Sequence, residues 1–354
     1  MMRPQKVGPM TLTCNSLIQG DKVVHFLHVK RRAWLAALAC LGMAAAAPFS
    51  ASAQTNFPTK TIRLIVPFPA GGPTDIFARQ YAIGLSRVLN QSVIVDNKAG
   101  ASGAIGSLEV KRSQPDGHTL LFGTASNLAL YNLMALKPQY DYLKDFTTVA
   151  VVGGSAVVIM SNKESPQTLK ALIDQAKANP TKFRYGSPGQ GTYLHLSMER
   201  FLLESGAKIE HIPYKGSGQA KPALLGGQTE TMVDALGSAL PLHQGGQAKI
   251  LAIAANKRSN LAPDVPTVNE ALGIKGFEAV LWNGVAAPAG TPKAVIDILA
   301  AATAKVLKDP GLVEQLKQLA MEPTDSTPES ATEYIKEEMV RWKPVIEKTG
   351  LRIE

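Results

Sequence analysis

Residues 62–79 constrain the fold more than any other stretch, because a short apolar run there meets two prolines and a glycine turn. Residues 62–66 are mostly β-branched or aliphatic, which predicts a short buried strand. Pro67 and Pro69 have no backbone N–H, so the strand cannot continue through them as part of a hydrogen-bonded sheet. The chain must therefore turn directly after this strand.

The turn leads into a predicted helix whose first residues suit an anion. Gly71 and Gly72 permit a tight turn, because neither has a Cβ. Pro73 suits the first helical position, and Asp75 complements the positive end of the helix dipole. Apolar residues then recur at helical spacing, at Phe77, Tyr81, Leu85 and Val88. The free N–H groups of such a helix start attract a carboxylate or a phosphate, although the same pattern also fits an ordinary first strand–helix turn of an α/β domain.

The N-terminal part of the sequence is typical of an exported protein. The first thirty residues follow no pattern, which indicates an over-extended start of translation. A basic run at 30–32 then precedes a short apolar segment at 33–47 and the small residues 51–53. This is the order of a secretory signal peptide, so we expect cleavage after Ala53 and a periplasmic mature protein. The arginine pair also fits a twin-arginine signal, which leaves the export route open.

The composition of the mature part excludes several function classes. Residues 1–53 hold six of the 37 Lys and Arg, one of the 28 acidic residues and both cysteines, Cys14 and Cys40. The remaining 31 basic and 27 acidic residues give a net charge near +4 without a basic, aromatic-rich cluster, so nucleic acid is not an expected partner. Without cysteines, the mature chain has neither disulfide nor thiol chemistry. Its length of about 300 residues favours two domains.

Strand and helix signals alternate along the mature chain. Strands are expected at 62–66, 92–96, 118–123, 149–160, 183–185, 209–213, 230–236 and 249–255, with a strand pair at 277–286. Helices are expected from 73, through 108–110, and at 167–178, 192–204, 220–225, 293–308 and 329–349. This alternation predicts an α/β fold with two sheets, one in each domain. Each sheet would be largely parallel and covered by helices on both faces. The glycine pair at 153–154 marks a passage between the two domains.

Three polar turns are candidates for a ligand site. Ligands of doubly covered sheets bind at the carboxyl ends of the strands, where the turns at 70–75, 124–127 and 186–192 lie. The third turn resembles a phosphate loop but lacks the closing Gly-Lys-Ser/Thr, so nucleotide binding is not expected. The hydroxyls of Ser187 and Thr192 in this turn remain candidates for a polar group of a ligand.

The sequence leaves the roles of two further residues open. His195 lies one turn into the helix that follows 186–192, and it either reaches the crevice or is a hydrogen-bonded structural histidine. Asp234 ends a predicted strand. Because a buried carboxylate is costly unless it is paired, its partner is either a ligand group or nearby backbone N–H groups.

The sequence predicts neither a metal site nor catalytic machinery. The histidines and acids show no metal-ligand spacing, and no Gly-x-Ser-x-Gly nucleophile turn occurs. The glycines at 100, 103 and 106 do not have dinucleotide-binding spacing and more simply let a helix pack closely on its sheet. Trp282 fits core or hinge packing better than ligand stacking. We therefore expect no cofactor, no metal and no enzymatic activity.

Eight segments of the mature chain together resemble one known family. They are IVPFPAGGPTD at 65–75, NKAGASG at 97–103, PDGHTL at 115–120, YGSPGQG at 185–191, HIPYKG at 211–216, LGGQ at 225–228, PDVPT at 263–267 and WNG at 282–284. In this order they resemble the Bug family, also called TctC-like, which comprises the extracytoplasmic solute receptors of tripartite tricarboxylate transporters.

The resemblance implies the architecture and its boundaries. The fold would be α/β, with two Rossmann-like lobes of the periplasmic binding protein type II class that close about a hinge. The first lobe would comprise 54–155 and 282–354, and the second would comprise 156–281.

The resemblance also implies a ligand site between the lobes. A first-lobe loop would hold a carboxylate through backbone N–H groups and ordered waters; its residues are Phe68, Ala70, Gly71, Gly72, Thr74 and Asp75. Ser126 and Asn127 would line the same lobe. Ser187, Gly189, Gly191, Thr192 and His195 would contact the ligand from the second lobe. Asp234 would select what the far end of the ligand carries.

The expected function is that of a periplasmic solute-binding protein. It would capture a small organic acid by hinge closure and deliver it to the membrane subunits of a tripartite tricarboxylate transporter. An alternative is a receptor whose closed form docks on a sensor or other signalling partner. A periplasmic hydrolase that uses Ser187, His195 or Asp234 is the least favoured reading. The sequence leaves dicarboxylate, tricarboxylate, aromatic acid and amino acid open as the ligand.

Overall fold

Residues 56–354 are described by a computed structural model, and the predicted signal peptide lies outside these described residues. They belong to a single compact unit of the chain. None of the helices that these residues form combines the length and the hydrophobicity that a membrane-spanning helix needs.

Strands and helices alternate along most of this part of the chain. The strands are β1 (Ile62–Val66), β2 (Val93–Asn97), β3 (Thr119–Thr124), β4 (Phe146–Ser161), β5 (Arg184–Ser187), β6 (Glu210–Pro213), β7 (Thr231–Ala235), β8 (Lys249–Ile253), β9 (Val280–Pro288) and β10 (Glu322–Pro323). The longer helices are α2 (Pro73–Leu89), α3 (Ala104–Lys111), α6 (Leu169–Ala178), α7 (Tyr193–Ser205), α8 (Ser217–Leu225), α9 (Leu236–Gln244), α11 (Lys293–Leu307), α12 (Pro310–Gln318) and α13 (Pro328–Thr349). Short helical segments are η1 (Ala101–Gly103), η2 (Ser126–Leu130), α4 (Tyr131–Met134), α5 (Tyr142–Asp145) and α10 (Val268–Leu272).

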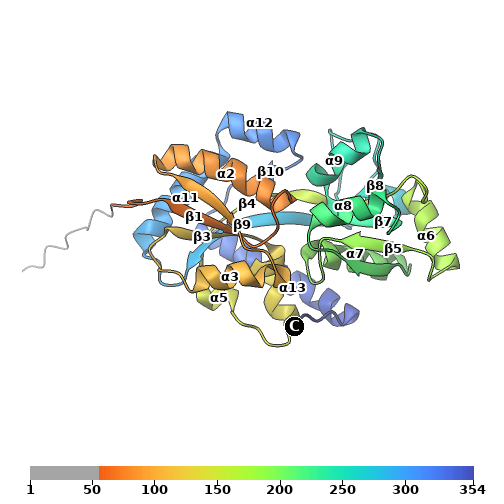
Figure 1. Ribbon diagram of the computed structural model, residues 1–354, viewed down its shortest axis with the longest axis horizontal. Helices are drawn as coiled ribbons and strands as arrows, with labels where there is room; N and C mark the ends of the chain where they lie inside the picture. The colour runs from red at the N-terminus through yellow and green to blue at the C-terminus, as the bar shows by residue number, and fades with distance from the viewer. Residues whose placement is uncertain (1–55) are drawn as a thin grey trace, which may run out of the picture. The chain divides into compact units, whose positions relative to one another are not determined.

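One long strand joins two groups of elements. The first half of β4 pairs with β9, and its second half pairs with β7 on one side and β8 on the other. The path of the sheet is β2-β1-β3-β9-β4-β7-β5-β6, with β8 and β10 paired to β4 off this path. Figure 1 shows β4 and β9 running from the group with α2, β1 and β3 to the group with α8, β5 and β7. We call these groups the first and the second lobe.

The prediction of largely parallel sheets is right only for the outer strands. β1 is parallel to β2 and β3, and β5 is parallel to β6 and β7. Every pairing of β4 and the pairing of β3 with β9 are antiparallel. The two strands that pass between the lobes run in opposite directions, and this imposes antiparallel pairing at the centre.

Several sequence predictions about elements are corrected. The strand pair expected at 277–286 is one strand, β9, and helices α9 and α12 lie in segments for which no helix was predicted. The glycine pair at 153–154 does not break β4. Gly153 has φ 129°, and a Cβ there would collide with the backbone oxygen of Glu322 in β10. The missing side chain therefore permits the close approach of β10.

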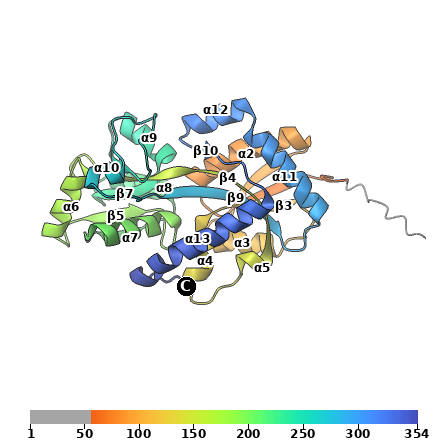
Figure 2. The ribbon, with the colours of Figure 1, turned by 180° about the vertical axis from the view of Figure 1, so that it is seen from behind.

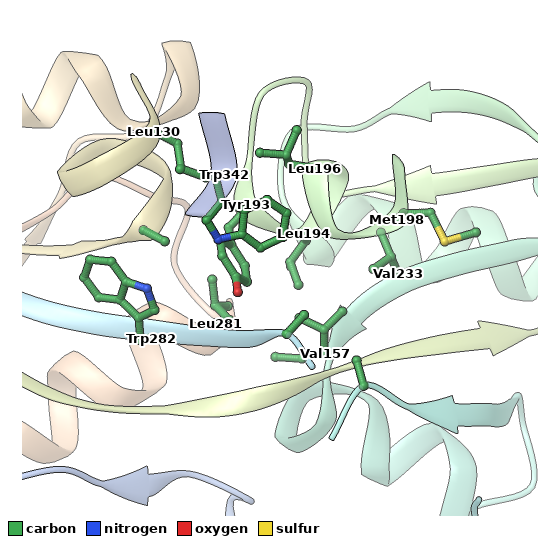
Figure 3. Packing of buried hydrophobic residues seen from close by; sticks show 14 of the residues in the cluster. Leu130, Val157, Tyr193, Leu194, Leu196, Met198, Val233, Leu281, Trp282 and Trp342 are labelled. Atoms are coloured by element: carbon green, nitrogen blue, oxygen red, sulfur yellow. The ribbon is translucent and has the colours of Figure 1, made fainter. Parts of the chain in front are cut away.

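The hydrophobic core extends through both lobes. One cluster lies in the first lobe and includes Phe77 and Leu299, and another lies in the second lobe and includes Met160. A third cluster contains residues of both. Figure 3 shows Tyr193 at the start of α7 lying in this cluster, with Trp282 of β9 on one side and Val233 of β7 on the other.

Helix α13 is fixed to β9 by a buried carboxylate. Glu338 is 1% exposed, and its Oε2 accepts hydrogen bonds from the indole Nε1 of Trp282 at 2.9 Å and of Trp342 at 3.2 Å. The Tyr193 ring packs edge-on against Trp342, with 5.0 Å between ring centroids. Figure 2 shows α13 running past β9 toward α7. One carboxylate oxygen of Glu338 thus accepts hydrogen bonds from both β9 and α13, which are distant in sequence.

Replacement of this acceptor should destabilise the fold. In Glu338→Leu, two buried indole N–H groups lose their acceptor, and we expect the free energy of unfolding to fall by about 2–4 kcal/mol. Glu338→Gln keeps an oxygen acceptor and should lose about half as much. Urea unfolding followed by tryptophan fluorescence measures both values. A Glu338→Leu protein as stable as the wild type would show that these bonds contribute nothing net.

Candidate functional site

A cleft lies at the carboxyl ends of strands from both lobes, as expected for the parallel parts of the sheet. Its lining residues are Phe68, Pro69, Ala70, Gly72, Pro73, Thr74, Thr124, Ser126, Pro188, Thr192, Leu194, Gly216, Ser217, Gly218 and Leu281. The space between them is about 500 Å³, including the part open to solvent, which suits a small organic molecule. No lining residue carries a charged side chain.

Helix α2 points its N-terminus into the cleft from the first lobe. Its N-cap residue is Gly72, which has no side chain to accept a hydrogen bond from the first turn. Pro73 at the first helical position has no N–H, so the donors of the first turn are the backbone N–H groups of Thr74 and Asp75. These donors are therefore available to an anion in the cleft.

The side chain of Asp75 holds this loop in shape from behind. Its carboxylate accepts hydrogen bonds from the Gly71 N–H and from Asn97 Nδ2, both at 2.9 Å, and lies 3.0 Å from Arg79. Burial would raise the pKa of Asp75, but the bonds from Arg79, Gly71 and Asn97 together lower it. Asp75 is thus ionised, and its carboxylate is bound by donors of the protein itself.

Helix α8 points a second uncapped N-terminus into the cleft from the second lobe. Its N-cap is Gly216, at φ 91°, and again no side chain caps the helix. The first-turn residues Ser217 and Gly218 both line the cleft. Their backbone N–H groups have no partner within the helix. The sequence prediction began this helix at residue 220, so it missed this second set of donors.

Asp234 lies behind Ser217 and is completely buried. Its carboxylate accepts hydrogen bonds from Ser217 Oγ at 2.9 Å, from the Ala235 N–H at 2.9 Å and from Ser238 Oγ at 2.8 Å. Burial raises the pKa of Asp234, against the opposing effects of these bonds and of Lys221. The Ala235 N–H is a partner of the backbone kind considered from the sequence, whereas the two serine hydroxyls were not considered there.

Helix α7 also begins in the cleft, and two N–H groups of its first turn have partners in the protein. Thr192 caps it by accepting from the His195 N–H at 3.3 Å. The Tyr193 N–H donates to Ser126 Oγ, across the cleft wall, at 2.9 Å. Ser126 therefore joins the end of β3 to the start of α7. Unlike α7, helices α2 and α8 have no side-chain cap at the cleft.

A stack of aromatic rings supports the loop before α7. The rings of His195 and His211 lie face to face with 3.8 Å between centroids, and the Tyr185 ring stacks on His211 with 4.8 Å between centroids. His195 Nδ1 accepts from the Gly191 N–H at 3.1 Å, and Ser187 Oγ lies 2.6 Å from His211 Nε2. Burial lowers the pKa of His195 to about 3 and that of His211 to about 4, and the neighbouring His211 contributes to the shift of His195. The stack is neutral at pH 7.

A family comparison decides the class of protein. A family model described as the tripartite tricarboxylate transporter family receptor, TctC, matches residues 77–351. The chain belongs to the TctC family. It is similar to protein BugT of Bordetella pertussis, with 37% identity over 312 residues that cover 87% of this chain and 94% of the relative.

Solved structures support the same assignment for the fold. Rpa4515 of R. palustris with adipate has a TM-score of 0.80 and 32% identity to this chain. The match covers 84% of this chain and 99% of the solved Rpa4515 chain. MatC of Rhodopseudomonas palustris with bound malate has a TM-score of 0.77 and 30% identity to this chain. The match covers 82% of this chain and 100% of the solved MatC chain. This TctC-family chain thus has the two-lobed α/β architecture of type II periplasmic binding proteins, and it is a solute-binding protein.

The structure brings some of the sequence-predicted site residues to the cleft and places others behind it. The predicted residues that line the cleft are Phe68, Ala70, Gly72, Thr74, Ser126 and Thr192. Those outside the lining are Gly71, Asp75, Asn127, Ser187, Gly189, Gly191, His195 and Asp234. Several of the latter bond to the loops that form the lining. Asn127, for example, accepts from the Thr124 N–H and donates to Ser107.

A side chain at position 72 of this TctC-family chain should block binding without unfolding the protein. A Cβ on Gly72 would have only the Pro69 oxygen within 4 Å, at 3.4 Å, so it would point into open space at the cleft. We expect Gly72→Val to keep the thermal midpoint but to weaken carboxylate binding at least about 100-fold, with Gly72→Ala intermediate. Isothermal titration measures the affinities. An unchanged affinity for Gly72→Val would contradict the role of this turn.

The histidine stack should make the fold sensitive to acid. Because the folded-state pKa values of both histidines lie below 6.5, the unfolded chain binds more protons once the pH falls below that value. The free energy of unfolding should therefore fall as the pH drops from about 6.5 toward 4, by at most about 1.4 kcal/mol per pH unit for each histidine. His211→Asn should flatten this dependence. Urea unfolding at several pH values tests it, and parallel profiles for both proteins would contradict it.

Proposed function

We propose that this protein is a periplasmic solute-binding protein that captures a small carboxylate between its two lobes for tripartite tricarboxylate transport. The observation that carries the proposal is the pair of glycine-capped helix N-termini, of α2 and α8, in a cleft without charged side chains. Each offers first-turn N–H donors and the positive end of a helix dipole. An anion is the ligand that satisfies both.

The walls of the cleft suit the carbon chain of such an acid. Phe68, Leu194 and Leu281 line it together with three prolines. Contact with these groups removes apolar surface of the ligand from water. Closure of the lobes would exclude water and strengthen the charge-assisted hydrogen bonds to the carboxylate. Polar ends and apolar walls together favour a short organic acid over an inorganic anion.

Similarity to solved proteins supports the same ligand class. The solved structures are of Rpa4515 with adipate and of MatC with bound malate. Adipate and malate are both dicarboxylates. The family model supports a transporter as the partner, so the closed form would deliver the acid to the membrane subunits of a tripartite tricarboxylate transporter. The predicted signal peptide would direct export and would be cleaved near Ala53.

The lobes would move about the strands that join them. We place the first lobe at 54–155 and 282–354 and the second at 156–281, so the hinge falls in β4 and β9. The fourteen predicted site residues then divide by role. Those in the lining would touch the ligand, and those behind it would hold the binding loops. Asp234 would act by orienting Ser217.

A receptor is better supported than a hydrolase. Ser187 and His211 lie 2.6 Å apart, the distance of a nucleophile–base pair. However, the Ser187 side chain is fully buried and lies outside the cleft lining. A nucleophile must reach the substrate, so this pair has a structural role instead.

A ligand screen tests the proposal. The purified protein is unfolded and refolded to remove any bound molecule, and thermal unfolding is followed with mono-, di- and tricarboxylates, aromatic acids and amino acids. An acid that binds only the folded state raises its stability by about 2.7 kcal/mol at a hundred times the dissociation constant. We expect a rise in the midpoint with one class of acids. Cooperative unfolding that no carboxylate shifts would contradict the proposal.

A further inference from the structure

One buried polar side chain beside the cleft lacks a partner. Asn283 is 4% exposed, and its Oδ1 accepts no hydrogen bond. Among residues 56–354, none of the hydrogen bonds involves its side-chain amide. A buried amide without a partner is destabilising, so such groups are rare in folded proteins and call for an explanation.

The register of the sheet places Asn283 directly beside two residues of the cleft lining, of which it is not itself a member. Asn283 lies in β9 directly opposite Thr124 of β3, and cross-strand neighbours share a face of the sheet. Leu281, two residues earlier in the same strand, shares that face as well. Thr124 and Leu281 both line the cleft. On its other side Asn283 is opposite Gly153, where the backbone of β10 approaches β4.

The adjacent residue supports this direction. The Trp282 side chain bonds to Glu338 of α13, and consecutive residues of a strand point to opposite faces. Asn283 therefore points away from α13, to the face of the sheet that carries α2 and the cleft. Its amide lies between two lining residues and has no protein partner there.

We propose that Asn283, together with the lining residue Thr124, forms a polar subsite beside the cleft that selects organic acids carrying a hydroxyl group. This inference rests on the proposed capture of carboxylates and adds which of them the cleft prefers. The inference is the same whether the N-terminus of α2 or that of α8 binds the carboxylate.

The hydrogen-bonding chemistry of the two side chains points to a hydroxyl. An amide offers both a donor and an acceptor, and a hydroxyl also offers both. Thr124 Oγ1 accepts from the Ser126 N–H at 3.2 Å, which leaves its own hydrogen free to donate. A ligand hydroxyl would satisfy the amide and accept from Thr124. An acid without a hydroxyl leaves the amide unpaired, and sites that bind a hydroxyl discriminate strongly against such analogues.

Matched pairs of acids test the subsite. The refolded full chain is titrated with malate and succinate, lactate and propionate, and 2-hydroxyadipate and adipate, since each pair differs by one hydroxyl. We expect the wild type to prefer the hydroxy acid of the pairs it binds by about tenfold or more. Asn283→Leu should lose most of this preference, chiefly by weaker binding of the hydroxy acid. Asn283→Ala is the second variant, for the case that leucine is not accommodated.

Two controls separate ligand selection from a structural role. The free Asn283→Leu protein should have a thermal midpoint no lower than that of the wild type, because an unpartnered polar group is removed. Asn256→Leu makes the same change at an exposed amide that bonds Glu278, and should leave both affinities of each pair unchanged. Equal affinity of the wild type for both members of each pair, or equal weakening of both in the Asn283 variants, would overturn the inference. Failure of every acid to bind the wild type would overturn the proposed function and this inference with it.

Discussion

The pairing of β4 with β9 is the constraint on which the site depends. β4 pairs with β9 along its first half and with β7 and β8 along its second half, so the two lobes share one continuous strand. This arrangement turns the carboxyl ends of β1 and β3 toward those of β5 and β6. Loops far apart in sequence, after β1 and before α8, therefore line one cleft. Glu338 fixes α13 to the same crossing through Trp282.

The cleft separates the groups that bind from the groups that hold them in place. Its lining has uncharged side chains, and the charged or titratable residues lie behind it. Asp75 fixes the turn before α2, Asp234 holds Ser217 at the start of α8, and the His195–His211 stack supports the loop before α7. Backbone N–H groups with their orientation fixed by such partners need little reorganisation to bind an anion. A receptor of this design uses helix ends where another site would use arginine.

Local signals predicted the α2 half of the site, and tertiary contacts determine the rest. Prolines, glycines and Asp75 specified the end of β1 and the start of α2 without any knowledge of the fold. The start of α8 was missed because Gly216-Ser217 is a weak helix signal and Pro222 lies inside the helix. The partners of His195 and Asn127 were unpredictable, since the residues they contact are placed by packing. Asn283 went unnoticed beside Trp282, because only the register with Thr124 brings it near the cleft.

The most direct test of the account is the position of a bound carboxylate. The refolded protein would be crystallised with the acid that binds most tightly, and the distances from the carboxylate oxygens to the backbone nitrogens of the first turns of α2 and α8 would be measured. The account predicts a carboxylate within about 2.7–3.2 Å of the nitrogens of Thr74 or Asp75, or of Ser217 or Gly218, with no lysine or arginine in contact. A carboxylate bound by a cationic side chain, or bound outside the cleft, would contradict it.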